Sequence, residues 1–413
     1  MIGKLGISMM IGVIVVLTAG CGTAATSDAQ ALSEQSTRLV PSTENEQPKK
    51  DEIIEKSGAV ATEDGRSGFV ALNTFREIAG MHPFSENSLL TKAADNHARY
   101  LIFHDLYTHK EVSGNAYFTG TYPSSRMAAV GYPHKEIAEN IYAGDVSPQR
   151  SVEILFSNIY HRLAFLDFGF DEIGIAMEES DRYRYKRVYT YEMGMAKNQS
   201  ANTLQNPKII LWPARDQEGV MPVFYEEEPD PLPECSVSGY PISLQFNPLK
   251  NGTIELLSFR LFDSEGHEVT DTHLMDRFND PSGHLKEGTF VLFPIERLGW
   301  AERYRVEVDY REEGGETKRL SWEFSTKRLP GRVFRVENAE MHFVVKSGES
   351  CFFDLPPKDC NDKFGTYTYR YTAGLKVEER IWDNNTIQFR ATGEGEVEIS
   401  PDNGRRFYIS VVR

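Results

Sequence analysis

The sequence predicts an α+β domain followed by two all-β domains, and three features of its patterning support this. At 413 residues, the chain is longer than one hydrophobic core usually supports. Apolar residues recur at helical spacing before residue 160 and in short, strand-like runs after residue 198. Two strand-like runs, 172–177 and 188–193, lie between these regions and read as a hairpin, as expected where an α+β domain ends.

The composition excludes one class of function. The formal net charge is −16 and 40% of the residues are hydrophobic, which is typical of a soluble globular protein. An acidic surface repels phosphate, so we expect no nucleic-acid partner. The acidic residues are spread along the whole chain, which indicates a solvated surface rather than a store of cations.

The N-terminus has the pattern of an export signal. Lys4 precedes an apolar run that ends at Leu17 and is too short to span a bilayer comfortably as a permanent helix. The residues Leu-Thr-Ala-Gly before Cys21 resemble a bacterial lipobox, in which the cysteine is acylated, as with palmitate, and becomes the mature N-terminus. We predict a signal peptide over residues 1–20 and a lipid on Cys21 as the membrane anchor, with plain secretion as the alternative.

Residues 21–66 are predicted to form a disordered tether. No aromatic residue occurs from Gly22 to Gly68, and the polar composition cannot bury enough apolar surface to offset ordering. As a random coil, this segment would span about 35 to 40 Å. It would hold the following domain clear of the lipid headgroups, on the extracytoplasmic side of the bacterial cell membrane or outer membrane.

Four helices are predicted in the first domain, residues 67–197. The first covers residues 69–80 and ends in glycine, and the second begins at Ser88, which can act as its N-cap. A short helix follows near residues 124–131. Ser147 caps a fourth helix, which has proline at its first position. Helices first and strands last within one domain predict an α+β sandwich.

Short β-branched and aromatic runs, separated by glycine-containing turns, fill the remainder of the chain. Within residues 205–328 they occur at the spacing of an immunoglobulin-like sandwich. The pattern restarts after Pro330 and predicts a smaller β domain over residues 331–413. The predicted strands lie near residues 243–246, 254–261, 289–293, 304–310, 320–324, 342–345, 367–371, 386–391 and 407–412.

Three cysteines follow the lipobox, and export permits disulfides among them. The short separation of Cys351 and Cys360 predicts a bridge between these two, worth about 2 to 3 kcal/mol on the loop-entropy scale. Cys235 would then be unpaired. No cysteine and histidine spacing is typical of a structural zinc site.

Six short motifs follow one another in the first domain: Leu72-Asn73 with Arg76, Thr108-His109, Arg126 with Gly131, Ala138-Glu139-Asn140-Ile141 with Gly144, His161-Arg162, and Ile173-Gly174-Ile175. In this order and with these gaps they resemble the bacterial form of the CAP superfamily, the SCP-like extracellular domain of cysteine-rich secretory, antigen 5 and pathogenesis-related proteins. The resemblance covers a third of the chain and implies an αβα sandwich with a central cleft.

The resemblance also implies a site in that cleft, built from a His, Glu, Glu, His tetrad. His109 matches the first histidine, Glu139 the first glutamate and His161 the last histidine. The position of the second glutamate falls on Asn158, which removes one negative charge from the tetrad. We predict that these four side chains line the cleft.

The chemistry of two imidazoles and one carboxylate leaves several interpretations open. His109 and His161 could bind a divalent cation such as zinc, or Glu139 could act as a general acid or base. Alternatively, all three are hydrogen-bonded structural residues. His97 and His104 form a competing cluster with His109, in which His97 is expected to be a core histidine because it lies on an apolar helix face.

Arg126 and Arg162 match family positions and are expected to pair with carboxylates. The sequence has no Gly-x-Ser-x-Gly elbow, His-Glu-x-x-His helix, Walker loop or EF-hand loop, and the first domain has no cysteine. These absences disfavour a serine hydrolase or a thiol protease.

Three functions remain open at this stage. The first is a membrane-anchored binding protein that takes a lipid, a cation or an envelope component in the His/Glu-lined cleft. The second is a metal-assisted envelope hydrolase, either a peptidase or a wall-lytic enzyme, that uses Glu139. The third is a non-catalytic surface adhesin or scaffold.

Overall fold

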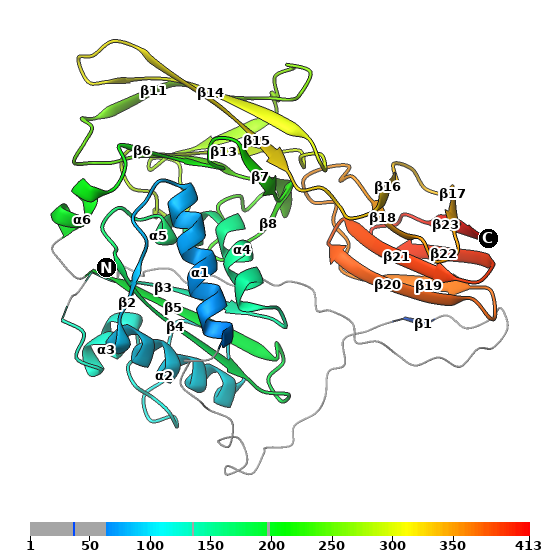
Figure 1. Ribbon diagram of the computed structural model, residues 1–413, viewed down its shortest axis with the longest axis horizontal. Helices are drawn as coiled ribbons and strands as arrows, with labels where there is room; N and C mark the ends of the chain where they lie inside the picture. The colour runs from blue at the N-terminus through cyan, green and yellow to red at the C-terminus, as the bar shows by residue number, and fades with distance from the viewer. Residues whose placement is uncertain (1–35, 38–62, 134–135, 196–198) are drawn as a thin grey trace, which may run out of the picture.

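The computed structural model describes residues 36–37, 63–133, 136–195 and 199–413 and shows three domains arranged along the chain (Figure 1). The predicted signal peptide, Cys21 and most of the predicted tether lie outside the described residues. Within the tether, β1 (Ser36–Thr37) pairs with a strand of the third domain. Among the described residues, no helix combines the length and the apolar character needed to cross a membrane.

The first domain is an αβα sandwich, as predicted. A four-stranded sheet in the order β2-β4-β5-β3 forms the middle layer. Helices α2 and α3 cover one face, and α1, α4 and α5 cover the other (Figure 1). The helices are α1 (Glu63–Ile78), α2 (Ser88–His104), α3 (Pro123–Ala129), α4 (Pro148–Ser157) and α5 (Ile159–Phe165), and the strands are β2 (Ser85–Glu86), β3 (Ala138–Ala143), β4 (Glu172–Glu179) and β5 (Arg187–Gly194).

The helix boundaries differ from the prediction in three places. Helix α1 begins at Glu63, six residues before the first apolar residue of its predicted stripe. The N-cap of α2 is Asn87 rather than Ser88, because the Asn87 side chain accepts hydrogen bonds from the backbone N–H groups of Leu89 and Leu90. The fourth helix stops at Asn158, whose backbone is extended, and α5 restarts directly after it.

Gly174 allows the closest approach between a helix and the sheet. A Cβ atom at this position would lie 2.0 Å from backbone atoms of Leu90 and Thr91, in the first turn of α2. We expect Gly174→Ala to lower the free energy of unfolding by about 2 to 3 kcal/mol, because α2 must move off β4. Gly252→Ala is the control in a urea titration, since its Cβ would meet no atom within 4 Å. Equal stability of the two variants would contradict this account.

The second domain is a sandwich of two four-stranded sheets, in the orders β12-β13-β10-β6 and β11-β14-β15-β7, with a small β8-β9 pair beside them. All five predicted strands are present. The shorter strands β6 to β9 and β12 had no sequence run long enough to predict them. The strands are β6 (Ile209–Trp212), β7 (Gln217–Val220), β8 (Val223–Tyr225), β9 (Val237–Gly239), β10 (Ile242–Phe246), β11 (Ile254–Phe262), β12 (Thr272–Met275), β13 (Thr289–Pro294), β14 (Arg303–Glu312) and β15 (Lys318–Thr326).

The first two domains share one hydrophobic core. Phe156 of α4 packs against Trp212 of β6, with ring centroids 5.0 Å apart, and both belong to the same buried cluster. The Tyr240 hydroxyl donates to the Phe156 carbonyl and accepts from the Trp212 indole. Arg162 of α5 crosses the same boundary and donates to the carbonyl of Pro241. Helix α6 (Gln199–Gln205) connects the two domains.

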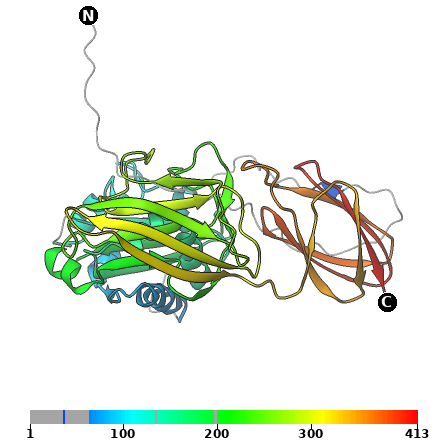
Figure 2. The same ribbon diagram turned by 90° about the horizontal axis from the view of Figure 1, so that it is seen from above.

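The third domain is a second sandwich, seen beside the first two domains in Figure 2. Its sheets have the orders β16-β18-β21-β20 and β1-β19-β22-β23-β17. All four predicted strands are present. The strands are β16 (Arg332–Arg335), β17 (Met341–Lys346), β18 (Ser350–Asp354), β19 (Tyr367–Tyr371), β20 (Lys376–Asp383), β21 (Thr386–Thr392), β22 (Gly395–Pro401) and β23 (Phe407–Val412).

The predicted disulfide is wrong. Cys360 bonds to Cys235 of the second domain, and Cys351 is a free, fully buried cysteine. Cys351 lies on β18 and points into the core of the third domain, whereas Cys360 lies in the loop after that strand. The short separation in sequence therefore does not bring these two side chains together.

The Cys235–Cys360 bridge and a buried arginine, Arg297, both join the second domain to the third. Arg297, of which only 4% is exposed, lies 2.9 Å from carboxylate oxygens of both Asp354 and Asp383 in the third domain. The backbone N–H of Val237 donates to the carbonyl of Cys360 across the same junction.

Reduction of the Cys235–Cys360 bridge should lower the free energy of unfolding by about 2 to 4 kcal/mol, because the bridge closes a loop of 125 residues. Urea titration with and without dithiothreitol measures this loss. Peptide mapping under non-reducing conditions provides the control. A peptide that joins Cys351 to Cys360 would contradict the assignment.

Candidate functional site

Glu139 lies at the centre of a buried network of charges. It is the second residue of β3, and one carboxylate oxygen accepts a hydrogen bond from Nδ1 of His109 while the other accepts one from Arg126. Burial alone would raise the pKa of Glu139, but the positive charges of Arg126, His97 and His109 outweigh it and hold the pKa well below its usual value. Glu139 is therefore a carboxylate at neutral pH, and its side chain is 1% exposed.

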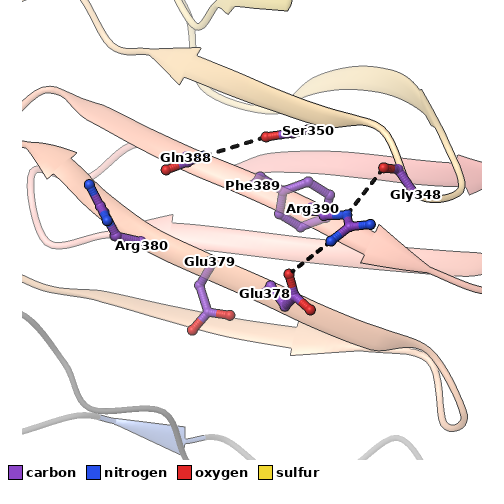
Figure 3. Close-up of a pocket in the computed structure, with 8 residues that line it drawn as sticks. All are labelled: Gly348, Ser350, Glu378, Glu379, Arg380, Gln388, Phe389 and Arg390. Atoms are coloured by element: carbon purple, nitrogen blue, oxygen red, sulfur yellow. Dashed lines mark hydrogen bonds and ion pairs between the residues drawn. The ribbon is translucent and has the colours of Figure 1, made fainter. Parts of the chain in front are cut away.

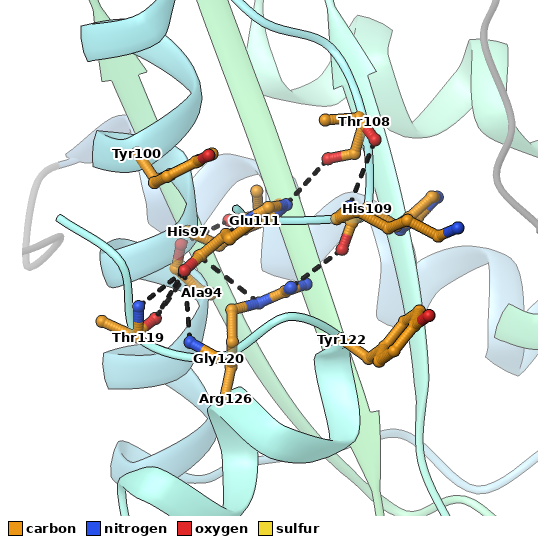
Figure 4. Close-up of polar contacts among 12 residues, drawn as sticks. Ala94, His97, Tyr100, Thr108, His109, Glu111, Thr119, Gly120, Tyr122 and Arg126 are labelled. Carbon is orange, nitrogen blue, oxygen red and sulfur yellow. Dashed lines mark hydrogen bonds and ion pairs between the residues drawn. The ribbon is translucent and has the colours of Figure 1, made fainter. Parts of the chain in front are cut away.

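A second carboxylate, Glu111, completes one side of this network (Figure 4). It accepts hydrogen bonds from the backbone N–H groups of Thr119 and Gly120 at 2.6 and 3.2 Å and lies 3.8 Å from Nε of Arg126. His97 of α2 contacts Glu111 through Nδ1 at 2.9 Å. These contacts tie the 105–122 loop to helices α2 and α3.

Glu192 is a third buried glutamate, directly opposite Glu139 in the β3–β5 pairing. Its carboxyl is fully buried and lies 3.9 Å from Arg126. Burial and the neighbouring Glu139 carboxylate raise the pKa of Glu192 well above its usual value. Two adjacent carboxyls that share one arginine are therefore in different states at neutral pH, with Glu139 charged and Glu192 protonated.

His161 lies in the first turn of α5 and is fully buried. Burial, reinforced by the charge of His109, lowers the pKa of His161 well below its usual value, so the imidazole is neutral. The adjacent motif residue Asn140 links β3 to this helix, because its side chain donates to the carbonyl of His161 at 3.0 Å. Glu139 and Asn140 are successive residues of β3, so the contacts with His109 and with His161 are made on opposite faces of this strand.

The carboxyl beside His161 comes from the second domain. Glu227, two residues after β8, lies 3.3 Å from Nδ1 of His161 and accepts hydrogen bonds from the backbone N–H groups of Ile159 and Tyr160. Burial raises the pKa of Glu227 to about 8, although those two backbone hydrogen bonds oppose the shift. Glu227 is therefore a neutral acid at pH 7, and the second domain covers His161.

Asn158 does not replace the charge of the second glutamate. It is 4% exposed, and its side-chain nitrogen has no hydrogen-bond partner among the described residues. The nearest carboxyl to His161 is instead Glu227, which reaches the site from a different domain.

The donor set does not fit the predicted zinc site. A structural zinc ion has four protein ligands, and a catalytic zinc ion has three protein ligands and a water. Within residues 63–133, 136–195 and 199–413, no three His, Cys, Asp or Glu side chains are grouped so that they could hold a metal ion. Glu139, which would be the shared carboxylate, is already bound by His109 and Arg126. We derive no metal chemistry from this site.

The predictions for His97, Arg126 and Arg162 have different outcomes. His97 is a buried core histidine with both ring nitrogens in contact, as predicted, since Nε2 lies 3.0 Å from the carbonyl of Thr108. Arg126 pairs with carboxylates, as predicted. Arg162 does not, because its guanidinium donates to backbone carbonyls and to the hydroxyl of Ser243. His104 lies outside the network and contacts the carbonyl of Ala116.

Sequence reasoning missed Glu111, Glu192 and Glu227. A signal for Glu192 was present, because a glutamate within the apolar run of β5 requires a buried partner. Glu111 follows His109 by two residues, but only the fold of the loop turns it towards His97. Glu227 stands among three consecutive glutamates, and nothing in that run distinguishes the buried one.

Three solved structures are among those similar to parts of this chain. An outer surface protein from Borrelia burgdorferi is 18% identical, covers 33% of this chain and 95% of its own length, and has a TM-score of 0.29. An extracellular protein containing a SCP domain from Bacillus anthracis is 14% identical, with a TM-score of 0.28; the match covers 32% of this chain and 40% of that protein. The N-terminal Ig1-2 module of the Drosophila receptor protein tyrosine phosphatase DLAR is 11% identical, covers 50% of this chain and 100% of its own length, and has a TM-score of 0.15.

Comparison with curated protein sequences gives no match. Residues 69–193 match the profile of the CAP family, described as the cysteine-rich secretory protein family. The matched segment begins in α1 and ends in β5, and it contains the six motifs and the whole αβα sandwich except for the first six residues of α1 and the last residue of β5. Residues 69–193 of this chain therefore form a CAP domain of the cysteine-rich secretory protein family, and two all-β domains follow it.

Proposed function

We propose that this chain is an exported, lipid-anchored binding protein of the cell envelope, and that its ligand contacts the CAP domain at the loop that carries His109. The observation that carries the proposal is the set of large apolar side chains that this loop exposes. The side chains of His109, Glu139 and His161 are themselves buried, at 6%, 1% and 0% exposed. A ligand would therefore contact the loop around His109 rather than the buried charges.

The loop that carries His109 exposes large apolar side chains, which supports a role in binding. Val112, Tyr117 and Tyr122 of the 105–122 loop and its end are exposed by 59%, 38% and 51%, which is unusual for large apolar side chains on one loop. The ammonium group of Lys110 lies 5.5 Å from the ring of Tyr122. Behind this surface, the network of Glu139, Arg126 and Glu111 holds the loop in place.

Co-sedimentation of the unlipidated chain with peptidoglycan sacculi and with phospholipid vesicles tests this proposal. We expect binding to one of the two, and a loss of about tenfold in the Val112→Ser/Tyr122→Ser variant, because two apolar contacts are removed. Phe278→Ser is the matched control, since Phe278 is 80% exposed in the second domain. Binding to neither material, or equal binding by all variants, would contradict the proposal.

The anchor is proposed from the lipobox-like sequence at Cys21, and the Cys235–Cys360 disulfide supports export because such bridges persist in oxidising compartments. Labelling of cells with an alkyne analogue of palmitate should mark the wild-type chain and not Cys21→Ser. The variant should be released into the soluble extracytoplasmic fraction. Labelling of both proteins would place the lipid elsewhere.

An envelope hydrolase that uses Glu139 is the alternative with less support. Glu139 is buried and both of its oxygens are occupied, so a substrate could not reach it without rearrangement of Arg126 and His109. Incubation of the full chain with peptide libraries and peptidoglycan tests this alternative, because turnover that Glu139→Gln abolishes would establish it. A scaffold function fits the rigid junctions between the domains, and in that case the envelope binding above would require only the β domains.

A further inference from the structure

An open groove of about 560 Å³ lies on the third domain, on the sheet of β18, β20 and β21 (Figure 3). This volume is within the range of ligand sites in proteins. The groove is distinct from the CAP domain and from the proposed binding surface at His109. On the outer face of the sheet its polar lining residues are Ser350, Glu378, Arg380, Gln388 and Arg390; Glu379, which alternates with them along β20, also lines it.

The strand register places these side chains in two rows on the outer face of the sheet. Ser350, Arg390 and Glu378 are direct neighbours across the three strands, and Gln388 is opposite Arg380 in the next row. The alternate residues of the same strands, such as Phe389 and Ile387, point into the core. Amide, hydroxyl, carboxylate and guanidinium groups therefore form a polar floor on a rigid sheet.

Most of this floor is internally paired, and Arg380 is the exception. Arg390 donates to the carbonyl of Gly348 at 3.2 Å and lies 3.6 Å from Glu378, while Gln388 donates to Ser350 at 3.4 Å. In the described part of the chain, Arg380 makes no hydrogen bond or ion pair. Its exposed guanidinium can therefore bind an anionic group, and carboxylate and phosphate match its planar geometry.

An aromatic ring lies beside Arg380. Trp382 is two residues further along β20 and so lies on the same face, with its ring centroid 5.3 Å from the Arg380 guanidinium carbon. Phe352 supports the indole from beneath, with ring centroids 5.2 Å apart, and the indole is half-buried. The Lys327 ammonium lies 5.9 Å from the centre of the same ring, so an aromatic ring and two cations stand together beside the groove. This combination can contact the edge of a sugar ring that carries an acidic group.

We propose that this groove binds an acidic carbohydrate. The open shape admits a polymer chain, Trp382 contacts a sugar ring at the edge of the groove, Gln388 and Ser350 bind hydroxyl groups, and Arg380 binds the acidic substituent. The overall charge of −16 would repel such a polymer elsewhere on the molecule, so recognition depends on the local arginine.

Titration calorimetry of the full chain with oligogalacturonate, and with its methyl ester as the uncharged match, tests the proposal. We expect the acid to bind at least tenfold more tightly than the ester, because only the acid makes a charge-assisted hydrogen bond with Arg380. Arg380→Gln should remove this preference, and Arg380→Lys should keep part of it. Arg370→Gln is the control, since Arg370 is 54% exposed on the opposite sheet of the same domain.

Three results of this titration would overturn the proposal. They are the absence of oligogalacturonate binding, equal binding of acid and ester, and an Arg380→Gln variant that binds like the wild type. A parallel titration with poly(glycerol phosphate) shows whether Arg380 binds a carboxylate or a phosphate group. Tighter, Arg380-dependent binding of that polymer would show that the site prefers a phosphate ester and would also overturn the assignment to a carbohydrate. Because no CAP-domain residue takes part, failure here would leave the function proposed for the His109 loop unaffected.

Discussion

Arg126→Met should lower the free energy of unfolding by about 3 to 5 kcal/mol. Arg126 is fully buried and contacts Glu139, Glu111 and Glu192 together. Its loss would leave the charged carboxylate of Glu139 buried without its guanidinium partner, and an uncompensated buried charge is strongly destabilising. Urea unfolding followed by circular dichroism measures the change.

Two comparisons make this result specific. Arg150→Met removes an arginine from a partly exposed pair with Glu153 and should cost less than about 1 kcal/mol. The double variant Arg126→Met/Glu139→Gln should recover part of the lost stability, because it removes the stranded charge as well. If Arg126→Met were as stable as Arg150→Met, the network would not be a structural element of the CAP domain.

Glu227 should make the protein less stable as the pH rises from about 4.5 to about 8. The unfolded carboxyl loses its proton near 4.5, whereas burial keeps the folded carboxyl protonated until about pH 8. In this interval the folded state binds more protons, so the free energy of unfolding falls with pH by up to about 1.4 kcal/mol per unit. Above about pH 8 both states are ionised and the slope from Glu227 ends.

The window from pH 6.5 to pH 8 isolates this effect from His161, whose lowered pKa matters only below its ordinary value of 6.5. Between pH 6.5 and pH 8 the free energy of unfolding should fall by about 2 kcal/mol more in the wild type than in Glu227→Gln. Glu226→Gln is the control, because the Glu226 carboxyl, next to Glu227 in the sequence, is 46% exposed and pairs with Lys363. Parallel profiles of all three proteins would contradict a buried, neutral Glu227.

Local patterns predicted the fold of the CAP domain well. The helical stripe, the Ser147 cap and the hairpin that became β4 and β5 depend on residues close in sequence, and all three are present. The N-cap of α2 was misplaced by one residue because Asn87 and Ser88 are both good N-caps, and only the structure shows that the Asn87 side chain accepts the hydrogen bonds.

Interactions between distant segments limited what could be predicted of the site. The family resemblance implied that His109 and Glu139 share one site, and their side chains are in contact. The position of Glu192 opposite Glu139 depends instead on the register of β3 and β5. Glu227 comes from another domain, so no pattern around His161 could indicate it. The disulfide failed for the same reason, because sequence separation does not show which way a strand residue such as Cys351 points.

The core that α4 and β6 build together has a practical consequence for work on this protein. A recombinant fragment that ends near residue 197 would lack Trp212 and Tyr240. The apolar surface that includes Phe156 would then be exposed to water. The Arg162 guanidinium would also lose its hydrogen bond to the carbonyl of Pro241. Such a fragment should bind hydrophobic dyes and precipitate, so the smallest piece worth expressing runs through both domains to the end of β15.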